Sequence, residues 1–209
     1  NVLTLVRYVE TFPVTVKISE HKNDKEIKNF ESKANRDNFI SYLLSEKVLS
    51  GEISLLELPI VNFDVNFVDI KDMLTSYPEL EYFENKISED KISKKLSIRV
   101  RERFFKSKKL TEHLESDKCH LRDILFQVCL TLSQINNIYP KFRHNNLTLD
   151  NINIYFKKDE GEDKVYYVGS NSYNYVSPGY ELKIGYFENA CLEPILGGNK
   201  VCKDDLYYF

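Results

Sequence analysis

The chain has 209 residues and is 42% hydrophobic, which suits one domain or two small lobes and excludes a wholly disordered protein. Its net charge of −3 argues neither for nor against a nucleic-acid partner. No apolar run approaches the roughly 20 residues of a membrane-spanning helix, and no signal peptide opens the chain. The four cysteines are widely spaced, and with the four histidines they show no zinc-site spacing. We therefore expect an intracellular protein with no membrane partner and no metal.

The first half of the chain predicts mainly strands, separated by one main helical region. The strand ranges are 2–9, 13–18, 55–68 (one or two strands, bent at Pro59) and 96–104. A helical pattern with two apolar stripes covers residues 27–43 and ends before Gly51. Residues 69–92 are charged and predict a short helix and a loop.

Three arginines alternate along the strand at 96–104, opposite an apolar face. They are Arg99, Arg101 and Arg103. Such a row could bind phosphate or an acidic partner, or it could be the solvated face of an edge strand. We favour the edge strand, because no aromatic residues alternate with the arginines as single-strand binding would require. The sequence therefore gives only a weak indication of a nucleic-acid partner, and we do not expect one.

The second half predicts a short helix near 110–115 and a long helix at 118–138, capped by Asp117 and ended by Pro140. One face of the long helix is apolar and predicted to be buried: Leu121, Ile124, Leu125, Val128, Leu132 and Ile135. Short strands are predicted at 152–156, 165–168 and 182–184, the second of them as the hairpin partner of the first.

The segment after the long helix resembles a catalytic loop. Residues 142–156 read Phe-Arg-His-Asn-Asn-Leu-Thr-Leu-Asp-Asn-Ile-Asn-Ile-Tyr-Phe. This resembles the protein-kinase motif H-x-D-L-x-x-x-N followed by an apolar strand. It is most similar to the loop F-R-H-N-D-L-H-x-x-N of proteins from large nucleocytoplasmic DNA viruses that are described as Ser/Thr kinases. The resemblance places His144 at the loop histidine, Asn146 at the catalytic aspartate and Asn151 at the metal-binding asparagine.

Two acidic positions of the kinase motifs are replaced. An amide at Asn146 can orient a hydroxyl but is not a usable base near neutral pH. In residues 182–190 the alignment of Phe187 with the motif phenylalanine puts Tyr186 at the metal-binding aspartate. A phenol is a poor ligand for Mg²⁺, which prefers carboxylate oxygens. The resemblance therefore implies that no residue is catalytic and no metal is bound.

The nucleotide side of the resemblance rests on Lys17. Val14-Thr15-Val16-Lys17 resembles the V-A-I-K strand, whose lysine pairs with phosphates, although a lysine that ends a strand can also be simply solvated. Its helix partner would be one of three glutamates: Glu26, Glu31 or Glu46. No glycine precedes Gly51, so a glycine-rich phosphate loop is not visible. We treat Lys17 and Asn151 as vestigial nucleotide-site residues and expect no bound cofactor.

The resemblance implies an α+β, protein-kinase-like fold of two lobes, truncated in the second lobe. A small β-rich lobe with one main helix would span 1–105, and a helical lobe with the degenerate loop would span 106–209. The function implied is that of a pseudokinase: a binding or scaffold protein, or virion component, of a large DNA virus, acting on protein partners in the host cytoplasm or virion.

Two other hypotheses remain. The chain could be an active Ser/Thr kinase that uses Glu188 or Asp150 as its acid. It could also be an unrelated α+β domain with a chance match to the loop.

Overall fold

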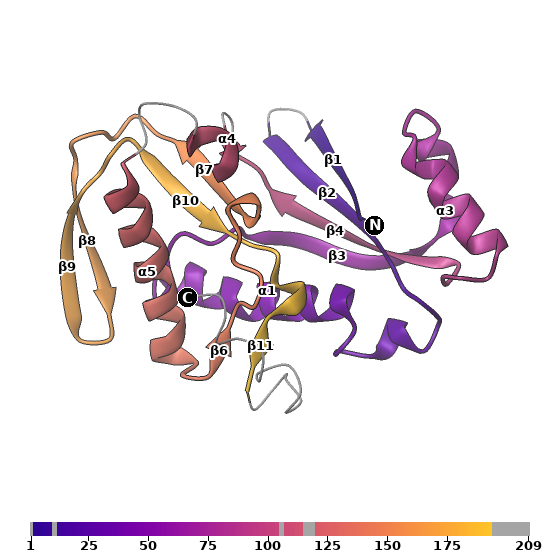
Figure 1. Cartoon of the computed structure of the whole chain (residues 1–209), viewed down its shortest axis with the longest axis horizontal. Coiled ribbons are helices and arrows are strands. Elements are labelled where there is room, and N and C mark those ends of the chain that lie inside the picture. The colour runs from indigo at the N-terminus through magenta and orange to yellow at the C-terminus, as the bar shows by residue number, and fades with distance from the viewer. Residues whose placement is uncertain (1, 10–11, 105–106, 115–119, 194–209) are drawn as a thin grey trace.

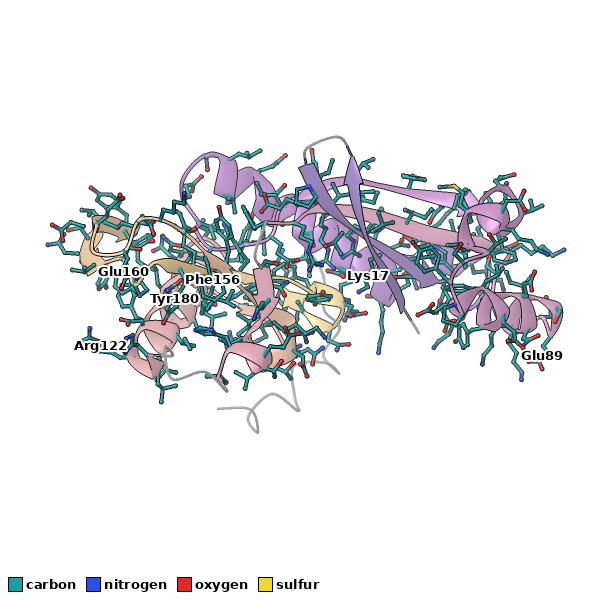
Figure 2. All side chains as sticks on the ribbon, turned by 90° about the horizontal axis from the view of Figure 1, so that it is seen from above. Lys17, Glu89, Arg122, Phe156, Glu160 and Tyr180 are labelled. Atoms are coloured by element: carbon teal, nitrogen blue, oxygen red, sulfur yellow. The ribbon has the colours of Figure 1, made fainter. Side chains whose placement is uncertain are left out.

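The computed structural model describes residues 2–9, 12–104, 107–114 and 120–193. The molecule is elongated (Figure 1), with helix α3 (Glu79–Ser88) at one end. Helix α5 (Leu121–Ile138) and the hairpin of β8 (Asp163–Val168) and β9 (Asn171–Val176) lie at the other end. Seen from above, Glu89 and Glu160 mark the two ends and Lys17 lies between them (Figure 2).

The first sheet has four antiparallel strands in the order β1–β2–β4–β3. Their bounds are Val2–Val9, Phe12–Glu20, Lys95–Glu102 and Pro59–Asn66 respectively. The strands predicted near 2–9, 13–18 and 96–104 are confirmed. The range 55–68, predicted as one or two strands, contains one strand, β3. Strand β4 is therefore an interior strand, and its register sets Arg99 opposite Lys17 and Arg101 opposite Thr15.

One hydrophobic core covers a face of this sheet. Ile18, Leu96 and Ile98 from the strands pack against the short helices α2 (Phe67–Ile70) and η2 (Lys71–Leu74) and against α3. The charged stretch at 69–92 thus contains more helix than the sequence predicted. Its apolar residues are few, but Leu74 and Phe83 are almost fully buried.

The main helix of the first half is α1 (Lys33–Leu49), preceded by the short helix η1 (Glu26–Lys28). Gly51 follows it with a φ of 79°, a left-handed conformation that glycine adopts easily. The buried face of α1 consists of Ala34, Asp37, Ile40, Ser41 and Leu44. An aspartate therefore lies on a face that is otherwise apolar or small.

The second sheet is antiparallel and has the order β10–β7–β5, with bounds Tyr180–Ile184, Ile152–Phe156 and Ser107–Lys109. The prediction that residues 165–168 pair with 152–156 is wrong, because β8 pairs with β9 through a tight turn at Gly169. Strand β7 pairs instead with β10. Both strands turn apolar residues into the core, among them Ile154, Leu182 and Ile184.

Helix α5 presents a different face from the one predicted. Ile124 and Ile135 are buried, but Leu121 and Leu125 are 62% and 53% exposed. The buried face includes Gln127 and Gln134, whose side chains bind backbone groups of the neighbouring segments. Those hydrogen bonds require the face of α5 that carries the two glutamines to point inward. Leu121 and Leu125, which belong to the predicted apolar face, therefore remain at the surface. The predicted cap, Asp117, lies outside the described residues.

The second hydrophobic core joins α1, α5 and the second sheet. It includes Ile40, Leu44, Ile53 and Leu56 as well as residues from the second half, so it crosses the predicted boundary at residue 105. The remaining elements of this part are α4 (Leu110–Leu114), β6 (Phe142–Arg143), η3 (Leu149–Asn151), η4 (Phe187–Asn189) and β11 (Cys191–Leu192). Within the described ranges no helix is both long and apolar enough to cross a membrane.

Candidate functional site

The candidate site lies where β2, α1, β4 and η4 meet. Lys17 on β2 is only 2% exposed, and its Nζ lies 3.3 Å from an oxygen of Asp37 and 3.2 Å from an oxygen of Glu188. Asp37 comes from α1, and Glu188 comes from η4 near the end of the described chain. The reading of Lys17 as a solvated strand end is therefore wrong.

The carboxylate from the helix is not one of the three predicted glutamates. Glu26 lies in η1 and Glu31 precedes α1, while Glu46 is an exposed residue in the last turns of α1. Asp37 is 0% exposed and faces β2. Its position on the apolar face of α1 was a visible signal in the sequence, because an aspartate there needs a buried cation.

Two arginines of β4 complete the buried charges. Arg99 forms an ion pair with Asp37, and Arg101 donates from Nη1 to Glu57 Oε2 over 2.8 Å. Both arginines are at most 2% exposed. The interpretation of this row as the solvated face of an edge strand is wrong, since β4 lies between β2 and β3, Arg99 contacts α1 and Arg101 contacts Glu57. Only Arg103 reaches partial exposure.

Asp37 links the members of this cluster, since it pairs with both Lys17 and Arg99. It also accepts a hydrogen bond from the backbone N–H of Phe187 over 2.8 Å, which ties α1 to η4. Burial alone would raise the pKa of Asp37, but the charges of Arg99, Lys17 and Arg101 hold that pKa well below its ordinary value of 3.8. The carboxylate is therefore ionised at neutral pH.

Tyr186 lies against the cations of this cluster. Its φ of 66° is left-handed, an uncommon conformation for a residue other than glycine. The guanidinium carbon of Arg101 is 4.4 Å from the centre of the ring and Lys17 Nζ is 5.3 Å from it. Both distances are within cation–π range. Burial, with the nearby Glu57 charge, raises the pKa of the phenol, so Tyr186 is neutral near pH 7.

Gly185, the residue before Tyr186, has no room for a side chain unless its neighbours move. A Cβ at Gly185 would lie 2.7 Å from Glu57 Oε2 and 3.1 Å from Arg101 Nη1. Glu57 cannot easily move away, because its other oxygen accepts a hydrogen bond from the amide of Asn153. The Arg101–Glu57 ion pair therefore crosses directly over the backbone at Gly185.

The loop after α5 contacts the site through His144. The Nε2–H of His144 donates to the carbonyl of Gly185 over 3.0 Å, and its ring lies 5.2 Å from that of Phe187. Burial lowers the pKa of His144 to about 4, so the imidazole is neutral near pH 7. Asn151 donates from its amide to the carbonyl of Asn146 over 2.8 Å.

The structure thus places the predicted residues in two pairs. Lys17 contacts Tyr186, and Asn151 contacts Asn146, while His144 lies against the segment that carries Tyr186. Sequence reasoning missed Asp37 and Glu57 and did not place Arg99 and Arg101 at the site. Among the described residues, no group of three or more histidine, cysteine, aspartate or glutamate side chains could hold a metal ion.

A small cavity of about 180 Å³ adjoins Tyr186. Its lining includes Thr15, Glu57 and Tyr186 together with Phe104 and Tyr155, whose ring centres are 4.4 Å apart. Pockets for drug-sized ligands and cofactors usually measure about 300–1,000 Å³. The cavity is therefore small for a nucleoside triphosphate.

Comparison with known proteins relates the chain to viral sequences. No protein-family model matches it. It is 28% identical over 162 residues to an "Uncharacterized protein" of Acanthamoeba polyphaga mimivirus, a match that covers 76% of this chain and 19% of that protein. It is 34% identical over 85 residues to a "Putative serine/threonine-protein kinase" of the same virus, covering 39% of this chain and 18% of that protein.

The chain therefore spans about a fifth of the length of these two relatives. Among solved structures it is similar to "WaaP in complex with acyl carrier protein", with a TM-score of 0.47 and 10% identity, over 91% of this chain and 58% of that one. The sequence matches support a relationship to viral proteins, one of which is named as a protein kinase.

Proposed function

We propose that the chain is a catalytically inactive, protein-kinase-like binding module. The observation that carries this proposal is the internal pairing of Lys17. In protein kinases the corresponding lysine pairs with a helix carboxylate and with the phosphates of ATP. In this chain the helix carboxylate is that of Asp37, and Glu188 pairs with Lys17 where a kinase lysine would pair with phosphate.

The catalytic side of the site supports the same proposal. Asn146 carries an amide where a kinase has its catalytic base, and the amide of Asn151 is already bonded to the backbone of Asn146. At the proposed metal position, Tyr186 presents a neutral ring that is stacked against Arg101. A neutral phenol beside a guanidinium is a poor place for a divalent cation.

A second candidate function is that of an atypical active kinase. It is favoured by the position of Glu188, which follows Tyr186 by two residues and whose carboxylate pairs with Lys17. The other acid considered, Asp150, accepts a hydrogen bond from the hydroxyl of Thr111 over 2.9 Å. Neither carboxylate is placed as a free base, so we rank this function second.

The biological setting that we propose follows from the viral relatives. The module would serve as a scaffold or virion component of a large DNA virus, and it would act by binding other proteins in the host cytoplasm or in the virion.

Phosphoryl transfer is the direct test. With labelled ATP and either Mg²⁺ or Mn²⁺, we expect no label above background in the chain or in casein and myelin basic protein as acceptors. Losing the general base alone typically costs a factor of about 10²–10⁴. Turnover that disappears in Lys17→Met and persists in the exposed control Lys94→Met would establish the atypical kinase instead.

Nucleotide binding is tested separately by thermal denaturation. Each lost charge-assisted contact removes about 1.5–3 kcal/mol, so two losses weaken ATP binding well over tenfold. We expect millimolar Mg·ATP to shift the melting temperature by less than about 1 °C, because stabilisation follows the ratio of ligand concentration to Kd. A larger shift that requires Mg²⁺ and vanishes in EDTA would contradict the proposed loss of the metal site.

A further inference from the structure

Strand β3 is the outer strand of the first sheet, on the side of α1 (Figure 1). Within the described ranges it pairs with β4 alone, so its other edge presents unpaired backbone donors and acceptors. Six of its eight residues are exposed. The edge is therefore open to another strand.

Most of this edge lacks the features that usually prevent strands from pairing. Natural edge strands are commonly protected by lysine, proline or a bulge. In β3 the proline, Pro59, and a bulge between Pro59 and Val61 both lie at the first end. From Val61 to Asn66 the strand has no lysine, no proline and a single charged residue, Asp64. Its central part is thus unprotected.

An aromatic groove of about 310 Å³ lies beside this edge, between α1 and β3. Phe30, Tyr42 and Phe63 line it and are 64%, 59% and 48% exposed. Together they leave about 350 Å² of aromatic surface in water, since one such side chain has about 200 Å². The largest apolar patch on a typical monomer is about 300–600 Å² and often functional. The aromatic groove and the open edge thus form one surface suited to being covered.

The direction of the backbone groups restricts how two β3 strands can pair. The N–H of Phe67, just after β3, donates to the carbonyl of Lys94 over 2.8 Å. Backbone groups alternate along a strand, so those of Phe63 also face β4, and those of Asn62 and Asp64 face the free edge. Two copies related by a two-fold axis must set outward-facing residues opposite each other. Near the middle of β3 this leaves registers centred on Asn62, Phe63 or Asp64.

Two of these registers are unfavourable. The one centred on Asp64 sets two carboxylates directly opposite each other, which is destabilising. The one centred on Asn62 sets the carboxylate of Asp64 opposite the apolar side chain of Ile60. The register centred on Phe63 instead sets Asp64 opposite the amide of Asn62. Oδ2 of Asp64 can accept from that amide, because it is Oδ1 that lies 2.9 Å from His21 Nε2.

We propose that two copies of this chain associate through their β3 strands, antiparallel and centred on Phe63. The two phenylalanine rings meet at the two-fold axis, and Val61 of each copy lies opposite Val65 of the other. The amide of Asn62 donates to the carboxylate of Asp64 in the other copy, twice by symmetry. Aromatic and apolar cross-strand pairs of this kind stabilise antiparallel sheets. Two four-stranded sheets thereby become one sheet of eight strands.

The dimer is expected to be weak and to depend on protein concentration. With Ile60 and Val61, the exposed apolar surface amounts to about 500 Å² per copy, whereas a standard interface hides about 800 Å² per partner. Sedimentation velocity from low-micromolar to submillimolar concentration should show the sedimentation coefficient rising from that of one chain towards that of two. A single monomeric species at every concentration would overturn the proposal. The proposal goes beyond the proposed function, since it holds whether or not the chain transfers phosphate.

A charge at the two-fold axis tests the location of the interface. Phe63→Asp sets two carboxylates opposite each other and removes the ring contact, so it should raise the dissociation constant of the dimer by at least about tenfold. The monomer does not need this side chain, and circular dichroism at high dilution should show it folded. The matched control is Tyr167→Asp, at a 60% exposed position on β8, and it should leave the dimer unchanged. Dissociation by Tyr167→Asp and not by Phe63→Asp would place the interface at the β8–β9 hairpin.

The register is tested by cross-linking. Phe63→Cys should form an intermolecular disulfide, because opposite residues of a non-hydrogen-bonded pair have Cα atoms about 4.5 Å apart. In the registers centred on Asn62 or Asp64 the two cysteines would be diagonal, about 7–8 Å apart, which is too far. Non-reducing gel electrophoresis measures the cross-linked fraction, and the control Val165→Cys shares the native cysteines and lies on β8. Cross-linking of Phe63→Cys no greater than that of Val165→Cys would contradict this register.

Discussion

Replacing Asp37 with alanine is expected to lower the free energy of unfolding by about 3–5 kcal/mol, the usual cost of breaking a buried ion pair by removing one partner. The substitution would leave Arg99 without its carboxylate and Lys17 with Glu188 alone. It would also remove the acceptor of the Phe187 N–H. Urea denaturation followed by circular dichroism measures the loss.

Two further variants make this result interpretable. Asp37→Asn keeps the shape and one acceptor, so it should be less damaging than alanine but still clearly destabilising. Asp72→Ala, at an exposed position in η2, should change stability by no more than about 0.5 kcal/mol. A loss below about 1 kcal/mol in Asp37→Ala would mean that the buried cations find other partners, and the cluster would not be what ties α1 to η4.

The same carboxylate gives the protein a dependence on pH with a definite sign. Because the pKa of Asp37 is lower in the folded state than in the unfolded chain, its contribution is complete above the ordinary aspartate value of 3.8. That contribution is lost progressively as the pH falls below this value. Asp37→Asn should therefore flatten the fall in stability that the parent protein shows on acidification from pH 5 to pH 2.

Replacing Phe187 with alanine is expected to cost about 3–5 kcal/mol, which is typical for a phenylalanine removed from a packed core. Phe187 is 1% exposed, and its ring contacts those of Phe142 and His144. The loss would uncouple η4 from the loop that carries Asn146. Urea denaturation again gives the magnitude.

The matched control is Phe63→Ala, the same truncation on edge strand β3, where the side chain is 48% exposed. It should cost less than about 1.5 kcal/mol, because much of the ring already contacts water. Similar losses for the two variants would show that Phe187 is not a central contact of the second core.

Much of the fold could be predicted from local patterns. β-branched runs and clean alternation located β1, β2, β4, β7 and β10, since these signals depend only on neighbouring residues. The partner of β7 was not predicted, because a tight turn at Gly169 lets β8 pair with β9 and leaves β7 to pair with β10. Such a competition between turns cannot be decided from the strand pattern alone.

The candidate site was harder to predict, because its partners come from distant segments. The sequence indicated Lys17 and the loop at 142–156, but no local pattern reports that Asp37 meets Lys17 or that Glu57 meets Arg101. Arginine side chains on strands are usually exposed to solvent. This general rule fails where carboxylates from other elements surround the arginine, as they do here. An aspartate on the inner face of α1 was the one usable clue.

The two buried glutamines of α5 determine how that helix is oriented. Gln127 binds both the N–H of Leu182 and the carbonyl of Tyr180, and Gln134 binds the N–H of Ser54 and the carbonyl of Tyr167. Each side-chain amide can therefore be placed in only one orientation, because its NH₂ group must donate and its oxygen must accept. A helix held only by an apolar stripe can rotate or slide with little penalty, but α5 would have to break all four bonds together. The rotation of α5 about its own axis is therefore fixed by which groups donate and which accept these hydrogen bonds. The exposed leucines on its surface are a consequence of that rotation.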